Sequence, residues 1–303
     1  MNKTEDTNIK ALELNESDLF IKNMFSIFNK FKLFANRIYK RKNFRLKKIV
    51  YKPDLIGPIT INIHIRHMYY ENSITGNNNK NRPIGFSYEN IFINLINTLT
   101  NIEHNVVVKL FVYYTGTLEE MQNDKSIKLL SNLKISTQFK IVKGSSALDS
   151  WLIMLREIYN SDTKDDEFIY LLENDYIHDL NWIDYILELA RSSINFDYIT
   201  LYDHPDRYTH SERYQKTHLY TTKTRHWAQT NSTCASFITK FSQFKKDFRH
   251  FYTYRHDDYI FRKLTINLKR RLLMPVPALS THAEIEFLSP VVELEKLLTK
   301  THY

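Results

Sequence analysis

Residues 168–178 read FIYLLENDYIH and join a strand pattern to a group of polar side chains. An apolar and aromatic run ends at Leu172 and is followed by Glu173, Asn174 and Asp175. Such a run is typical of a strand that is buried on both faces. If the strand continues, Glu173 and Asp175 point the same way, since side chains alternate along a strand. Two such carboxylates suit Mg²⁺ or Mn²⁺ bridging a diphosphate, and an ordinary turn built on Asn-Asp is the alternative.

Strand and helix patterns alternate around this stretch. The predicted strands cover residues 59–70, 106–116, 136–144, 167–173 and 196–203, and the predicted helices cover residues 86–99, 118–132, 145–159 and 181–192. This alternation predicts βαβ units, and therefore an α/β fold with a mostly parallel, Rossmann-type sheet flanked by helices. Beyond about residue 218 we expect a short hairpin, a helix, and a last helix near residues 255–270.

Each predicted strand becomes polar where it ends, and open α/β sheets bind ligands outside the carboxyl ends of their strands. We therefore expect the functional site at this edge. No GxGxxG or GxxxxGK[ST] pattern follows any of the strands. Phosphate must then be held in another way, and a divalent metal on carboxylates is the obvious route.

The positive charge of the chain lies near its N-terminus. Of the net charge of +8, all belongs to residues 1–53, because residues 54–303 contain equal numbers of acidic and basic side chains. We predict a basic helical extension over residues 1–53 and one domain over residues 54–303. Residues 20–40 have the spacing of an amphipathic helix. It could pack on the domain, or residues 20–50 could contact a membrane surface or an anionic partner. We do not expect a nucleic-acid partner.

Cysteine content and hydropathy exclude several classes of protein. The single cysteine, Cys234, excludes an internal disulfide framework and a zinc site made of cysteines. No apolar run reaches the length of a membrane span, and the polar N-terminus has no signal-peptide pattern. We expect a cytoplasmic protein, with peripheral membrane contact as the open alternative. The frequent Asn, Ile, Lys and Tyr indicate an AT-rich genome, such as that of a low-GC microbe or a giant virus.

The apolar strand with its acidic triplet, after three earlier βα units, resembles the DxD region of GT-A glycosyltransferases, including family-2-like enzymes. The resemblance covers about residues 57–290, and the triplet reads END in place of DxD. It implies a GT-A-like fold and a Mn²⁺ or Mg²⁺ ion bound by Asp175. It also implies Glu173 as a partial ligand and His282, in PALSTHAE, as a second protein ligand. A structural role for His282 is the alternative.

The same resemblance implies a general base in the HDDY stretch that begins at His256. By position we favour Asp258, with Asp257 as the alternate. The base would deprotonate the acceptor hydroxyl as it attacks the anomeric carbon. Acidic residues in the first turn of a helix also complement the helix dipole, which is the alternative explanation.

Donor and acceptor contacts are expected from further strand ends and loops. Arg66, Thr115 and Asp149, together with Glu173 and Asn174, are the candidates for contacts to the nucleotide. Turn, helix-start and surface roles are the alternatives for the first three. Sugars are recognised by aromatic faces and by polar side chains. The acceptor-binding candidates are therefore Asp203, Arg225 and Trp227, and a buried core position is the alternative for Trp227.

These residues lead to three functional hypotheses. The first is a metal-dependent, inverting glycosyltransferase that moves a sugar from a nucleotide-diphosphate donor, most plausibly a UDP-sugar, to a hydroxyl of a glycan, lipid-linked or protein acceptor. The second is a degenerate binding or structural protein of the same shape, docked by its basic N-terminal helix. The third is a metal hydrolase that uses Asp203, His204 and His256.

Overall fold

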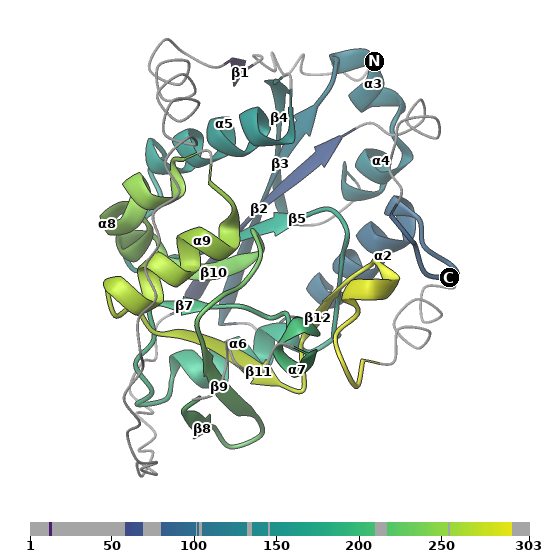
Figure 1. The fold of residues 1–303 in the computed structure, drawn as a ribbon. Helices are drawn as coiled ribbons and strands as arrows, with labels where there is room; N and C mark the ends of the chain where they lie inside the picture. The colour runs from purple at the N-terminus through teal and green to yellow at the C-terminus, as the bar shows by residue number, and fades with distance from the viewer. Residues whose placement is uncertain are drawn as a thin grey trace, which may run out of the picture.

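The protein is described from a computed structural model (Figure 1). The described residues are 58–68, 80–100, 102, 105–131, 135–144, 146–209, 217–253 and 255–292, with the backbone of 12–13. The predicted helix over residues 20–40 therefore lies outside the described residues, as does most of the N-terminal extension. Among the described residues, no helix is both long and apolar enough to cross a membrane.

The first half of the fold is a parallel sheet with the order β4-β3-β2-β5. Its strands are β2 (Ile59–Met68), β3 (Val106–Thr115), β4 (Ser136–Lys143) and β5 (Phe168–Glu173). In the register of this sheet, Ile63 lies between Leu110 and Tyr170. The crossovers contain α2 (Tyr88–Leu99), α3 (Leu118–Asn123), α4 (Lys125–Ser131) and α5 (Ala147–Tyr159). At the outer edge, β1 (Leu12–Glu13) pairs in parallel with β4.

The sheet continues beyond β5 with mixed strand directions. This half consists of β7 (Tyr198–Ile199), β8 (Leu219–Thr221), β9 (His226–Thr230), β10 (Phe237–Lys240) and β11 (Leu272–Val276). β10 is antiparallel to both β5 and β7, and β9 is antiparallel to β11 and β8. The other described strands of this sheet share one direction. The expected α/β class with a mostly parallel sheet is therefore confirmed.

Helices cover both faces of the sheet (Figure 1). One core joins Ile61, Ile63 and Ile65 of β2 to α2, α4 and α6 (Trp182–Ala190). The other joins Ile169 and Leu171 of β5 to α5, α8 (Phe241–Phe251) and α9 (Asp257–Arg262). Neighbouring residues of a strand face opposite sides, so continuous apolar strands supply both cores.

The remaining described elements are short. They are the strands β6 (Tyr176–His178) and β12 (Ser280–His282), the helix α7 (Asp206–Thr209), the π-helical turn η2 (Lys263–Asn267) and the 3-10 turn η3 (Ile285–Phe287). β6 and β12 form a separate antiparallel pair. The predicted last helix is thus α9 followed by η2.

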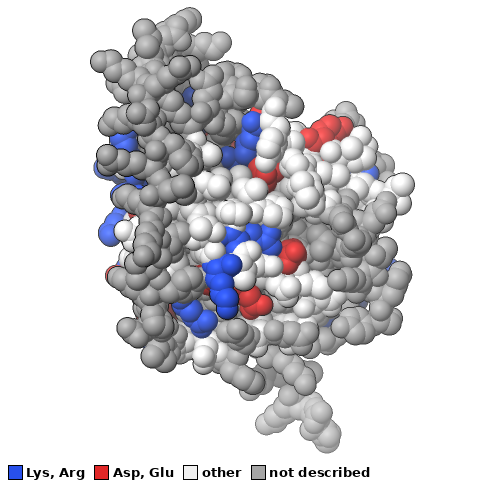
Figure 2. Space-filling view, turned by 90° about the horizontal axis from the view of Figure 1, so that it is seen from below, with Lys and Arg blue, Asp and Glu red and all other residues white. Residues whose placement is uncertain are grey.

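Charged side chains of both signs lie side by side on the face shown in Figure 2. In the described part of this face, Lys and Arg stand next to Asp and Glu among uncharged residues. This mixed pattern differs from the continuous basic patch that is typical of nucleic-acid-binding proteins. In the described part of this face, charge is thus arranged in local groups of opposite sign.

Candidate active site

The candidate site begins where β5 ends. The strand stops at Glu173, and the chain turns through Asn174 and Asp175 into β6. β6 pairs with β12, which sets Tyr176 opposite His282, and the carbonyl of Asp175 accepts a hydrogen bond from the N–H of Ala283 at 2.8 Å. This pairing brings a residue near the C-terminus of the described chain to the acidic triplet.

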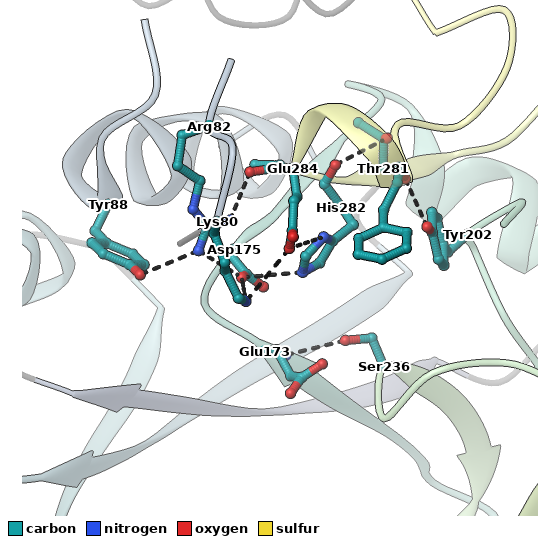
Figure 3. A network of polar contacts seen from close by, with 12 residues as sticks. Lys80, Arg82, Tyr88, Glu173, Asp175, Tyr202, Ser236, Thr281, His282 and Glu284 are labelled. Atoms are coloured by element: carbon teal, nitrogen blue, oxygen red, sulfur yellow. Dashed lines mark hydrogen bonds and ion pairs between the residues drawn. The ribbon is translucent and has the colours of Figure 1, made fainter. Parts of the chain in front are cut away.

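Asp175 is the centre of a cluster of cationic and imidazole side chains (Figure 3). Its carboxylate oxygen Oδ2 lies 3.1 Å from Nε2 of His282, 3.0 Å from Nζ of Lys80 and 3.0 Å from Nη2 of Arg82. Glu284 lies beyond them, with its Oε2 3.9 Å from Lys80 Nζ and 3.6 Å from His282 Nδ1. The two residues to which the resemblance assigns one metal ion, Asp175 and His282, are therefore in contact.

Burial and pairing act in opposite directions on the Asp175 carboxyl group. Burial alone would raise its pKa, because it disfavours the charged form. The hydrogen bond from His282 and the charges of His282 and Lys80 outweigh this effect and hold the pKa of Asp175 well below its usual range. Asp175 is therefore a carboxylate at neutral pH, fixed by its own neighbours.

Glu173 has different partners from Asp175. Its Oε1 accepts a hydrogen bond from Nη2 of Arg66 at 2.5 Å, and the other end of that guanidinium donates to the carbonyl of Ala147 at 2.9 Å. Burial raises the pKa of Glu173, although 31% of its side chain is accessible. The charge of Arg66 opposes this shift, and the charges of Asp175 and Asp257 add to it. Glu173 therefore forms an ion pair with Arg66.

Asn174, the middle residue of the triplet, is turned into the interior. Its amide Nδ2 donates to Nδ1 of His67 at 2.8 Å, and Nε2 of His67 lies 2.8 Å from Oδ2 of Asp124. Asp124 in turn accepts the backbone N–H of Ser126 at the start of α4. Asn174 is 8% exposed. The expected nucleotide contact through Asn174 is thus at odds with its position, because the amide is buried and already bonded.

The three other nucleotide candidates meet at the first turn of α5. Arg66 bonds to the carbonyl of Ala147, and Thr115 Oγ1 donates to Ser150 Oγ at 3.0 Å. Asp149 lies in the same turn, and its backbone N–H is capped by Ser146 Oγ. Asp149 is completely buried. Arg66 and Thr115 stay candidates for donor contacts, whereas the side chain of Asp149 is buried inside the fold.

The acidic pair at the start of α9 divides into two environments. Asp258 accepts a hydrogen bond from Ser232 Oγ at 2.8 Å, and its side chain is 50% exposed. Burial raises the pKa of Asp257, and the Asp257 charge raises the pKa of Glu173. The Asp257 charge therefore acts on Glu173 of the triplet, whereas the Asp258 carboxylate is bonded to Ser232 in the loop after β9. These electrostatic effects, together with the half-exposed position of Asp258, make Asp257 the candidate base that we prefer.

The acceptor candidates are less accessible than expected. Trp227 is 0% exposed, and its Nε1 donates to Thr222 Oγ1 at 3.2 Å, so it is a core residue and presents no face to a sugar. Arg225 stacks on the ring of Tyr185 at 4.0 Å. Asp203 accepts a hydrogen bond from Tyr208 Oη at 2.6 Å and is buried. The predicted acceptor platform at Trp227 is therefore wrong.

The donor set around Asp175 decides how well a metal fits. Among the residues that the structure describes, no three His, Cys, Asp or Glu side chains are grouped so as to hold a metal ion. This statement covers the Asp175 group as well as the hydrolase set of Asp203, His204 and His256. The one Asp175 oxygen that faces His282 already contacts two cations. In this arrangement the residues do not fit a divalent ion.

Lys80 and Arg82 were missed by the sequence analysis. Asparagines dominate residues 75–83, and such a composition is typical of a polar surface loop. The only available signal was the pair of alternating cations in KNRP, which follows the first predicted strand. Such a pair is common in surface loops, so spacing alone could not place it at the triplet.

No protein-family model matches the chain, and no curated relative matches it. Among solved structures it is similar to mouse xyloside xylosyltransferase 1, with 10% identity over 71% of this chain and 84% of that one, at a TM-score of 0.41. It is also similar to the inositol-1-phosphate CTP transferase of T. maritima, with 12% identity over 82% and 98% and a TM-score of 0.42. A third is the 2-C-methyl-D-erythritol 4-phosphate cytidylyltransferase of Francisella tularensis, with 13% identity over 79% and 98% and a TM-score of 0.39. At these values the similarities carry no functional argument, and the proposals below rest on the site.

Proposed function

We propose that the chain is a glycosyltransferase of the GT-A type that uses a nucleotide-diphosphate sugar, with a UDP-sugar as the first candidate donor. The observation that supports this most directly is the 3.1 Å contact between Asp175 and His282, at the carboxyl edge of the sheet. Ligands of open α/β sheets bind at this edge. The acceptor is a hydroxyl of a glycan, a lipid-linked sugar or a protein.

In the proposed reaction, Asp257 is the general base. It takes the proton of the acceptor hydroxyl while that oxygen forms a bond to the anomeric carbon. The bond from this carbon to the diphosphate breaks, the electron pair leaves with the diphosphate, and the anomeric centre is inverted. A raised pKa suits this role, since a base is most effective when its pKa lies near the working pH. Arg66 and Thr115 are the proposed contacts to the nucleotide.

The expected Mn²⁺ or Mg²⁺ ion on Asp175, Glu173 and His282 is untested, and the proposal does not depend on it, because the described side chains do not fit a divalent ion as they are arranged. Contact of residues 20–50 with a membrane also stays a prediction, because those residues lie outside the described part of the chain. The hydrolase hypothesis is not favoured. Asp203 is held by Tyr208 and Arg207, and His204 Nδ1 lies 2.9 Å from Asp206 Oδ1.

The experiment is a turnover assay of the full chain with a panel of nucleotide sugars, with and without Mn²⁺, that measures release of the nucleoside diphosphate. Water serves as the acceptor where no sugar acceptor is known. Asp257→Asn should lower kcat by about 100-fold or more, while KM for the donor changes little. The wild-type rate should fall as the pH falls through the raised pKa of Asp257, and this acidic limb should be missing in the variant.

Asp258→Asn is the matched control, because it removes a carboxylate from the same helix turn. The kcat of this variant should stay within about threefold of wild type, because the described partners of the Asp258 carboxylate are Ser232 and Arg262, which lie outside the triplet. A large loss in Asp258→Asn alone would transfer the role to that residue. Absence of turnover and of nucleotide binding across the whole panel would show that the proposed function is wrong.

A further inference from the structure

We infer that the ammonium group of Lys80 binds the diphosphate of the donor, and that Lys80 and Arg82 together supply at Asp175 the positive charge that a divalent metal would otherwise supply. This inference rests on the proposed function and deepens it. In this arrangement Lys80 holds the leaving diphosphate, and binding of the donor does not require a metal ion.

The first support is the position of the two cations. Nζ of Lys80 and Nη2 of Arg82 each lie 3.0 Å from the same oxygen, Oδ2 of Asp175. His282 Nε2 approaches that oxygen as well. The side chains thus converge on the carboxylate to which the family resemblance assigns the metal. Lys80 and Arg82 carry two positive charges, which equals the charge of one Mg²⁺ or Mn²⁺ ion.

The second support is that the two cations are bound differently. Arg82 is held on several sides, since Nη1 donates to the carbonyl of Ala283 at 2.6 Å and the guanidinium lies over the ring of Phe86 at 4.3 Å. Its side chain is 18% exposed. Arg82 therefore positions the cluster and has little capacity for a further ligand.

Lys80 has donors left for a ligand. An ammonium group has three N–H donors, and among the described residues its close partner is one oxygen of Asp175, with Glu284 more distant at 3.9 Å. The Lys80 side chain is 38% exposed, whereas that of Asp175 is 7% exposed. The ammonium is thus anchored from the buried side and open on the other. Lysine binds phosphate as a compact point charge, and holding it in place reduces the entropy lost on binding.

The third support is the link between Lys80 and the rest of the site. Asn81 accepts the backbone N–H of Ile285 through its carbonyl at 2.8 Å and donates to Glu286 through its amide at 3.1 Å. The segment that contains Lys80 and Arg82 is therefore tied to the chain just after His282. These bonds hold the Lys80 ammonium beside the carboxyl edge of β5, where a donor diphosphate would lie.

The test is calorimetric titration of the full chain with UDP, GDP, ADP and CDP, in EDTA and in Mn²⁺. We expect at least one nucleoside diphosphate to bind in EDTA with an affinity close to that in Mn²⁺. Lys80→Met keeps the aliphatic stem but removes the charge, and should weaken this binding by about tenfold or more. Lys80→Arg should recover part of the affinity, because it restores the charge.

Lys245→Met is the matched control, since Lys245 pairs with Asp165 at the start of α8 and is not part of the cluster. It should bind the nucleotide as wild type does. Binding that requires Mn²⁺, or equal affinity of wild type and Lys80→Met, overturns the inference and leaves the proposed function standing. Failure of all four nucleotides to bind under either condition overturns both. Thermal unfolding of each variant shows that a loss of binding is not a loss of fold.

Discussion

Asp247 shows at the scale of one residue how this chain keeps a charge inside the fold. Its side chain is 2% exposed and accepts hydrogen bonds from Nε and Nη2 of Arg270, each at 2.8 Å. Tyr198 Oη and Gln243 Nε2 each donate to it at 2.6 Å. Burial alone would raise the pKa of Asp247, but these hydrogen bonds outweigh it and lower the pKa below its usual value. The carboxylate therefore joins β7, α8 and the segment before β11.

Asp247→Asn should lower the free energy of unfolding at pH 7 by about 3 kcal/mol, because it breaks a buried, hydrogen-bonded pair. A carboxylate with a lowered folded-state pKa stabilises the fold fully above its unfolded pKa of about 4. That contribution is lost as the pH falls further, toward the folded-state pKa. Urea unfolding at pH 7 and pH 3 should thus show a smaller difference between wild type and variant at pH 3.

The exposed Asp165 provides the control for this measurement. Its side chain is 68% exposed, so Asp165→Asn should change stability by less than about 0.5 kcal/mol at either pH. A constant difference between wild type and Asp247→Asn across the pH range would contradict the assigned ionisation.

At the scale of an element, α3 illustrates how local chemistry starts a helix directly after a strand. Thr117 Oγ1 accepts the backbone N–H of Glu120, and the Glu120 carboxylate accepts the N–H of Thr117. Gly116 precedes this capping box with φ +156°, and a Cβ built there would lie 2.8 Å from a Glu120 carboxylate oxygen. The glycine therefore leaves room for the glutamate that completes the cap.

Thr117→Ala should lower the free energy of unfolding by about 1 kcal/mol, because the N–H of Glu120 at the helix start loses its hydroxyl acceptor. Thr117→Ser keeps the hydroxyl and should be within a few tenths, about 0.3 kcal/mol, of wild type. Chemical unfolding of the three proteins measures both differences. Equal losses in the two variants would assign the effect to the threonine methyl group and contradict the cap.

At the scale of the whole molecule, the two cores lie on opposite faces of one sheet. Phe92 of α2 is buried in the first core, and Phe251 of α8 is buried in the second, where it stacks on Phe237 at 5.1 Å. The strands that separate them contribute alternate side chains to each core. Because they share these strands, the cores should unfold together, as expected for one domain over residues 54–303.

Phe92→Ala and Phe251→Ala should each lower the free energy of unfolding by about 3–5 kcal/mol, since each leaves a cavity in a close-packed core. Far-ultraviolet circular dichroism and intrinsic fluorescence should give coincident, single transitions in both variants. A biphasic transition in either variant would show that the two faces belong to separately folding units.

Local sequence patterns were sufficient for the parallel half of the fold. The apolar run before Glu173 predicted a strand buried on both faces, and β5 is such a strand. The predicted helix over residues 145–159 is α5. These features depend on side chains close in sequence, and their periodicity reports which face is buried. The position of Asp175 at the carboxyl edge of the sheet followed from the same reasoning.

Contacts between distant segments were decided only by the tertiary structure. Placement of β10 between β5 and β7, burial of Trp227, and the bond of Asn174 to His67 depend on which strands and loops become neighbours. The meeting of Lys80 with Asp175 is of the same kind. The sequence by itself determined the α/β class and placed an acidic triplet at the end of a buried strand. Only the tertiary structure decided which cations that triplet faces, because periodicity encodes burial along one element and carries no information about its partner.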